Sequence, residues 1–298
     1  MTWQQALTDY QQYLSIERGL SANSIISYSR DIRKLIAFIE VNKIKKMPVD
    51  IGKDDLQQFI YEVAKTVNAK SQARLISALK GLFNYLVFED YRTDSPMELI
   101  ETPKIDRKLP DTLSESEIDE LIHAINLSKP QGERNRAMLE TLYGCGLRVS
   151  ELINLKLSDL FFEEGVILVT GKGNKQRFVP VSEVNKKYIN LYIDHIRVDQ
   201  NIKSGHEDYL FLNRRGKKLT RAMVFEIIKR LTEKIGLNKK VGPHTFRHSF
   251  ATHLLSNGAD LRSIQQMLGH ENITTTEIYV HVDRKHLAEV LQKFHPRK

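Results

Sequence analysis

The sequence has few of the features that mark secreted, membrane or metal-dependent proteins. It contains one cysteine, Cys145, which excludes an internal disulfide and a zinc site built from cysteines. No apolar run approaches the roughly 18 residues that span a membrane. The first residues, MTWQQALTDY, lack the basic and apolar regions of a signal peptide. No P-loop, acidic metal cluster, internal repeat or low-complexity segment is visible. These absences favour a cytoplasmic protein with no membrane partner.

Positive charge is present in excess, and it is unevenly distributed. The 298 residues carry 45 Lys or Arg and 37 Asp or Glu, a net charge of +8. Residues 1–106 contain 14 residues of each sign, so the whole excess lies in residues 107–298. A localised basic excess favours a polyanionic partner, above all nucleic acid. A solvated surface with a high isoelectric point explains the composition equally well, so charge alone leaves both interpretations open.

Apolar residues recur at helical spacing through most of the chain. In the first hundred residues they predict four helices, and hence a compact four-helix bundle. Residues 91–112 break this periodicity with three prolines and mixed charges, which is typical of a linker. We therefore expect a boundary near residue 106, between domains at 1–106 and 107–298.

The second domain is predicted to be mostly helical, with a small antiparallel sheet. Residues 165–170 (GVILVT) and 176–181 (QRFVPV) are rich in β-branched residues and flank the turn sequence GKGN. This pattern predicts a β-hairpin with Lys172 at its tip. The predicted fold class is therefore mainly α, with the sheet confined to the second domain.

The segment PHTFRHSF holds the densest group of candidate site residues. In a helix, His244, Arg247 and His248 would share one face, while Phe246 and Phe250 would face the core. The planar guanidinium fork of an arginine suits a phosphate. A helix with a solvated basic face fits the same pattern. A metal site on the two histidines is a further alternative, although the arginine between them would repel a cation.

His270 and Tyr279 follow, and Arg148 and Lys172 precede this segment. A tyrosine within ITTTEIYVHV is ordinarily a core or edge aromatic. To act as a nucleophile it must lose its proton, which costs about 4 kcal/mol at neutral pH for a reference pKa near 10. Nearby Arg and His side chains would lower this cost. Lys172 can give a proton to a leaving group, but it also fits an ordinary exposed turn lysine.

Five motifs, GCGLRVSEL, TGKGNKQR, HTFRHSFATHLL, LGH and TTTEIYVHVD, occur in an order and at spacings that resemble the tyrosine recombinase (phage-integrase-type) family. The resemblance covers the whole chain and includes the pattern S-x-N-S-x-x-x-Y-x-x-D from Ser21 to Asp31. The segments NGADLRSIQQMLGH and FHPRK are similar to the Xer branch of this family. Cys145 and Val280 depart from the threonines expected in many relatives.

The resemblance implies a phosphoryl-transfer site that needs neither a metal nor another cofactor. Arg148 and Arg247 would grip the scissile phosphate and stabilise its transition state. Tyr279 would attack that phosphate and form a covalent link to the DNA 3′ end. Lys172 would protonate the leaving 5′-hydroxyl, and His244 would assist proton transfer at the nucleophile.

Three further residues have supporting roles by the same resemblance. His270 would hydrogen-bond the phosphate, and Glu151 would orient the site. His248 would give structural support.

The resemblance also implies double-stranded DNA as the substrate and a tetramer as the active assembly. The first domain would clamp DNA with a face that includes Arg30, Arg33 and Lys34, although a plain solvated face is the ordinary alternative. The last helix would dock on a neighbouring protomer, and its alternative position is on its own domain. The partners implied are a related XerC-like recombinase and a septal DNA translocase. The resulting function is resolution of chromosome dimers at cell division.

Three other functions fit parts of the same pattern. A type IB topoisomerase shares the chemistry but acts as a monomer. A DNA-binding regulator would keep the fold without catalysis. A histidine-metal nuclease would depend on a bound cation.

Overall fold

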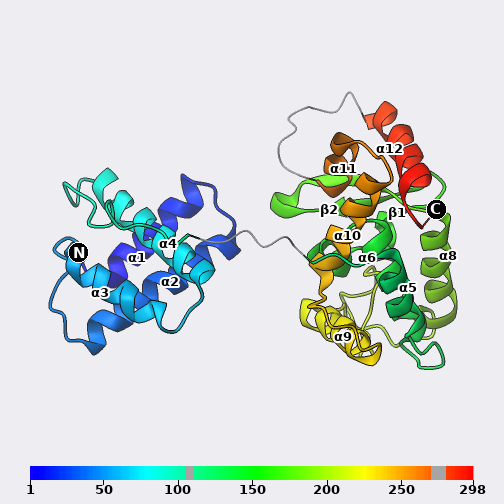
Figure 1. Ribbon diagram of the computed structural model, residues 1–298, viewed down its shortest axis with the longest axis horizontal. Coiled ribbons are helices and arrows are strands. Elements are labelled where there is room, and N and C mark those ends of the chain that lie inside the picture. The colour runs from blue at the N-terminus through cyan, green and yellow to red at the C-terminus, as the bar shows by residue number, and fades with distance from the viewer. Residues whose placement is uncertain (105–110, 270–279, 298) are drawn as a thin grey trace. The chain divides into compact units, whose positions relative to one another are not determined.

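The computed structural model describes residues 1–104, 111–269 and 280–297. The chain divides into two compact units, Met1–Lys108 and Leu109–Lys298 (Figure 1). Each unit has its own hydrophobic core. The boundary predicted at residue 106 falls within the undescribed residues 105–110. Within the described residues, no helix has both the length and the apolar character needed to cross a membrane.

The first unit is the predicted four-helix bundle. Its core is built from one apolar stripe on each helix, including Leu7, Ile32, Leu56 and Leu79, all of which are at most 1% exposed. Side chains that accept backbone N–H groups begin three of the helices, as is typical of N-caps. The helices are α1 Trp3–Ile16, α2 Ala22–Val41, α3 Lys53–Ala64 and α4 Ala69–Phe88.

The stretch after α4 differs in part from the predicted linker. Its described residues form no helix, as the prolines and mixed charges predict. However, Met97 and Ile100 are buried in the core of the first unit. Arg92 also donates hydrogen bonds to the carbonyl oxygens of Pro48 and Ile51, each at 3.0 Å. The chain up to Ile100 therefore belongs to the bundle, because two apolar side chains give this irregular segment enough surface to bury.

The second unit is mostly helical around a three-stranded antiparallel sheet. Strand order is β1-β2-β3, and the predicted hairpin is present as the pair β2 and β3. The short edge strand β1 was not predicted, because two residues carry no recognisable alternation. The strands are β1 Leu160–Phe161, β2 Val166–Thr170 and β3 Gln176–Pro180. The helices are α5 Glu115–His123, α6 Gly132–Gly144, α7 Val149–Asn154, α8 Glu183–Tyr192, α9 Arg221–Lys234, α10 Pro243–Ser256, α11 Leu261–Leu268 and α12 Val280–Phe294.

The helix α10, which carries the histidine and arginine candidates, lies in the middle of this unit. It contacts α6, α9, α11 and α12 (Figure 1). Phe246 and Phe250 are fully buried, as the sequence predicts. Their burial fixes the rotation of α10 about its axis, and so determines which side chains it presents to the turn after α6.

The last helix packs on its own unit. Leu287, Val290 and Leu291 of α12 are buried in the core of the second unit, and α12 contacts β3. The alternative in which this helix docks on its own domain is therefore the one seen in the single chain.

Candidate active site

A glycine turn places Arg148 at the start of α7. Helix α6 ends at Gly144, and Gly146 has a φ of +57°, a left-handed conformation that favours glycine. A Cβ atom at Gly146 would lie 2.5 Å from the ring of Phe250, so only glycine lets α10 approach this turn so closely. The local sequence GCGLR thus brings Arg148 next to α10.

Glu151 lies one helical turn after Arg148 and binds both its backbone and its side chain. Its Oε2 accepts a hydrogen bond from the backbone N–H of Arg148 at 2.8 Å. Its Oε1 accepts from Nη1 of the same residue, also at 2.8 Å. Only 1% of the Glu151 side chain is exposed. A carboxylate buried this deeply needs cationic partners to remain ionised.

Arg247 reaches the same carboxylate from α10. Its Nη1 donates to the carbonyl oxygen of Gly146 at 2.8 Å, and its Nη2 donates to that of Leu268 at 2.6 Å. Nη1 also lies 3.8 Å from Oε2 of Glu151. Burial, followed by the charge of Arg148, lowers the pKa of Arg247 to about 10. The guanidinium remains protonated at neutral pH and is held by backbone carbonyls on two sides.

Arg177, which was not among the predicted site residues, completes the surroundings of Glu151. Its Nη1 and Nη2 donate to Oε1 and Oε2 of Glu151, each at 2.9 Å, in a two-pronged ion pair. Its Nε donates to the carbonyl oxygen of Met267 at 2.8 Å. The sequence holds one signal for this role. Arg177 pairs with the buried Val169 across the hairpin, so it occupies an inward strand position where a cation needs a partner.

The four side chains form a cluster with a net positive charge. Burial alone would raise the pKa of Glu151, but hydrogen bonds and charge from Arg177, then from Arg148, hold it below its usual value. One carboxylate therefore faces three guanidinium groups. Arg148 is the most exposed of the three, with 32% of its side chain accessible, compared with 14% for Arg177 and 10% for Arg247. The cluster suits an anion that arrives on the side of Arg148, as a phosphate would.

The structure places the other predicted residues of this site only in part. His244 and His248 are both exposed on α10. Lys172 lies in the 3-10 turn Lys172–Asn174 between β2 and β3, where only its backbone is described. His270 and Tyr279 fall outside the described residues. Arg148, Glu151 and Arg247 are thus the predicted residues that are seen in contact.

In the part of the chain that the structure describes, no group of three or more His, Cys, Asp and Glu side chains lies close enough together to hold a metal ion. His244 and His248, the pair considered as ligands, lie on one helix with Arg247 between them in sequence.

The candidate DNA-contacting residues of the first unit lie along α2. Arg30 and Arg33 are exposed. Lys34 is partly buried, and its Nζ lies 3.2 Å from Oδ1 of the fully buried Asp31. Asp31 also accepts hydrogen bonds from Nε and Nη2 of Arg74, at 2.8 and 3.2 Å. Asp31 is the last residue of the sequence pattern that begins at Ser21, and its bonds to Arg74 join α2 to α4. The charge of Lys34 is partly neutralised by its ion pair with Asp31.

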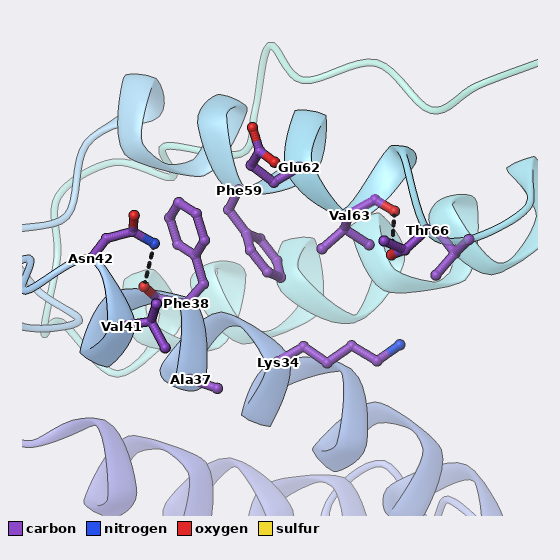
Figure 2. Close-up of a pocket in the computed structure, with 10 residues that line it drawn as sticks. Lys34, Ala37, Phe38, Val41, Asn42, Phe59, Glu62, Val63 and Thr66 are labelled. Atoms are coloured by element: carbon purple, nitrogen blue, oxygen red, sulfur yellow. Dashed lines mark hydrogen bonds between the residues drawn. The ribbon is translucent and has the colours of Figure 1, made fainter.

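Lys34 also borders a hollow between α2 and α3, with a volume of about 360 Å3 (Figure 2). The neighbouring rings of Phe38 and Phe59 line it, as does Glu62 of α3. None of the predicted catalytic residues lines this hollow. It is a feature of the bundle, separate from the arginine cluster.

Both units match models of known protein families. Residues 111–286 match the phage integrase family, and residues 7–90 match the N-terminal SAM-like domain of phage integrases. A protein of Staphylococcus saprophyticus named tyrosine recombinase XerD is 43% identical over 292 residues, which cover 98% of each chain. A protein of the same name from Oceanobacillus iheyensis is 43% identical over 295 residues, again 98% of each chain.

Among solved structures, the fold resembles that of the XerH site-specific recombinase bound to a palindromic difH substrate in a post-cleavage complex. The match has a TM-score of 0.70 and 24% identity, and it covers 94% of this chain and 80% of the other. The extent of the sequence matches assigns the family. The chain belongs to the phage integrase family, the family of tyrosine recombinases.

Proposed function

We propose that the protein is a site-specific tyrosine recombinase that cleaves and rejoins double-stranded DNA through a 3′-phosphotyrosyl intermediate. The observation that carries the proposal is the convergence of Arg148 and Arg247 on Glu151, which creates a rigid cationic site for a phosphate diester. The names of the relatives, and the family match over both units, support the same activity.

In the proposed reaction, the phenol oxygen of Tyr279 attacks the scissile phosphorus and the bond from phosphorus to the 5′ oxygen breaks. His244 assists removal of the phenol proton, and Lys172 gives a proton to the leaving 5′ oxygen. His270 donates a hydrogen bond to the phosphate, and His248 supports the helix that carries Arg247. The new phosphotyrosyl ester keeps the energy of the broken bond, so a 5′-hydroxyl can reverse the step and rejoin a strand without ATP.

The two arginines act mainly in the transition state. Negative charge grows on the non-bridging oxygens as the phosphorus becomes five-coordinate, and guanidinium groups already fixed in place stabilise that charge without reorganising. Arg247 is fixed by the carbonyls of Gly146 and Leu268. Glu151 fixes Arg148 by a hydrogen bond to its side chain. Removal of one such donor from a comparable site costs about 10²–10³-fold in rate.

We further propose how the protein works on DNA. The first unit would hold the duplex, with Arg30 and Arg33 on the phosphate backbone and Lys34 contributing less because Asp31 already binds it. Four subunits would act together on two duplexes, two of them from a related XerC-like recombinase, with α12 passing to a neighbouring subunit. Resolution of chromosome dimers in the cytoplasm at cell division, under the control of a septal DNA translocase, is the role that fits the XerD relatives.

A nicked duplex tests the proposed chemistry, because cleavage near a nick releases a short strand and traps the covalent intermediate. The duplex is taken from genomic DNA that the purified protein protects against nuclease. The wild-type protein should form an adduct that survives denaturant, with or without a chelator. Tyr279→Phe should form none, while the matched control Tyr61→Phe, at an exposed tyrosine of α3, should behave as wild type.

The outcomes separate this proposal from its rivals. A DNA-binding regulator would bind the duplex without an adduct, and a metal nuclease would lose activity in chelator. A monomeric relaxing enzyme would form the adduct but would not join strands from two separate duplexes. An adduct that persists in Tyr279→Phe would show that another residue is the nucleophile.

A further inference from the structure

We propose that Arg177 is a positioning residue for strand cleavage: it fixes the carboxylate of Glu151 against the two phosphate-binding arginines, and it joins the hairpin β2–β3 to the end of α11. The inference rests on the recombinase function proposed above. It adds a residue to which neither the sequence motifs nor the expected catalytic set assigns a role.

The contacts of Arg177 are directed inward. Both terminal nitrogens of its guanidinium donate hydrogen bonds to the two carboxylate oxygens of Glu151, and its Nε donates one to the carbonyl oxygen of Met267. Only 14% of the side chain is exposed. The Arg148 side chain, in contrast, donates one hydrogen bond to Glu151, from Nη1 at 2.8 Å. It makes two longer bonds of 3.4 Å to the carbonyl oxygens of Leu268 and Gly269, and it remains one-third exposed. Arg177 therefore acts through Glu151, whereas the exposed part of the Arg148 side chain can meet the phosphate.

The position of Arg177 connects three segments that must be aligned for catalysis. It lies on β3, five residues after Lys172 on the same hairpin. Met267, whose carbonyl it binds, lies in the last turn of α11, three residues before His270. Glu151 lies on α7, next to Arg148. A single side chain thus ties the hairpin of the proposed general acid to the helix of the phosphate-binding arginine.

Gly269 gives a second, independent sign that this contact is built into the fold. It ends α11 with a φ of +65°, and a Cβ atom there would lie 2.9 Å from Cδ and 3.0 Å from Nη1 of Arg177. The backbone at the end of α11 is therefore shaped around the arginine. A lysine at position 177 has no planar fork, so it cannot make the paired bonds to both carboxylate oxygens.

The charge of Arg177 affects the pKa of Glu151, and so the pH dependence of cleavage. A residue with a purely structural role would leave that pH dependence unchanged. Burial disfavours the ionised form of Glu151, and Arg177 is the strongest of the groups that oppose this effect on its pKa. Without Arg177, Glu151 takes up a proton at a higher pH and loses its charge-assisted bonds to Arg148. As the solution is acidified, the cleavage rate should therefore begin to fall at a higher pH than in the wild type.

The test measures the single-turnover rate of adduct formation on the nicked duplex, and the affinity for the same duplex, across a range of pH. For Arg177→Gln we expect a loss of rate on the order of 10²-fold with little change in affinity, because misplacing the phosphate-binding groups affects the chemical step. The acidic limb of the rate profile should move to higher pH. Arg177→Lys should recover part of the rate. Arg230→Gln, which removes an arginine from an exposed ion pair with Glu226 on α9, should match wild type.

A double mutant tests whether Arg177 acts through Glu151. In the Glu151→Gln background, Arg177→Gln should cause little further loss, because the carboxylate that it positions is already gone. Losses that multiply would overturn the proposal, as would an Arg177→Gln variant with the rate and pH profile of wild type. If Arg177→Gln alone fails to fold, Arg177→Lys is compared in the wild-type and the Glu151→Gln backgrounds instead, and losses that multiply overturn the proposal in the same way. Absence of a wild-type adduct would instead contradict the proposed function.

Discussion

At the scale of residues, the site is organised by one buried carboxylate. Glu151 binds the backbone of Arg148 and the side chains of Arg148 and Arg177, and it lies within 4 Å of Arg247. The folded pKa of Glu151 lies below its ordinary value, so its ionised form stabilises the fold. That contribution is complete above the unfolded pKa and is lost as pH falls through the folded pKa.

A second buried titratable group lies at the C-terminal end of the second unit. His295 is fully buried, and its Nδ1 accepts a hydrogen bond from the backbone N–H of Arg297 at 3.0 Å. His253 and Arg297 face it, and the side chain of Arg297 also binds Asp119 and Glu140. Burial, followed by the charges of His253 and Arg297, lowers the pKa of His295 from 6.5 to about 3.

This lowered pKa predicts an acid-sensitive second unit. Between pH 6.5 and about 3 the unfolded chain binds a proton at His295 that the folded chain does not, so the free energy of unfolding should fall as pH decreases through this window. His295→Asn keeps an acceptor for the Arg297 N–H and removes the titration, so the decrease should become shallower. Urea denaturation at several pH values gives the slope of the unfolding free energy against pH for the wild type and for His295→Asn. Equal slopes for the two proteins would contradict the assignment.

At the scale of elements, the ends of helices and strands create the site. Arg148 is the cap residue of α7, Leu268 and Gly269 end α11, and Arg177 lies near the start of β3. Backbone carbonyls that are free at a helix C-terminus become acceptors for the guanidinium groups, as Leu268 shows for Arg247.

The sequence predicts these elements better than it predicts their contacts. Helical periodicity and the β-branched hairpin were sufficient for the four-helix bundle, for β2 and β3, and for the buried Phe246 and Phe250. Met97 and Ile100 were misread as linker because two apolar residues in an irregular stretch have no periodicity to detect. Arg177 was missed because its partners lie 26 and 90 residues away along the chain, and no local pattern reports such a pairing.

The end of α11 offers a matched test of the packing around Arg177. Gly269→Ala should lower the free energy of unfolding by the cost of a left-handed alanine, roughly 1–2 kcal/mol, plus a further loss from its clash with Arg177. Gly236→Ala, at a φ of +67° with no atom within 4 Å of its Cβ position, should show the backbone cost alone. Chemical denaturation compares the two. Equal losses would mean that Arg177 does not constrain this turn.

At the scale of the whole molecule, the two units have separate hydrophobic cores. The bundle core and the core around α6 and α10 consist of separate sets of buried residues. Most of the basic excess lies in the second unit, with the arginine cluster. Each unit can therefore fold around its own core.

Separate cores predict separate unfolding transitions. Leu79→Ala in α4 removes a fully buried side chain of the first core and should cost about 2–5 kcal/mol there. Leu142→Ala in α6 should act in the same way on the second core. Calorimetry should show each substitution lowering one transition and leaving the other in place. A single transition that both substitutions shift equally would show that the units unfold together.

The central claim is that this chain breaks DNA by joining it to Tyr279, and the most direct measurement is the position of the covalent bond. The trapped adduct is digested with nuclease and trypsin, and the nucleotide-bearing peptide is identified by mass spectrometry. We expect the added nucleotide on Tyr279, within the tryptic peptide that spans residues 263–284. A nucleotide on any other residue, or an unmodified peptide in a sample that has cleaved its DNA, would contradict the account.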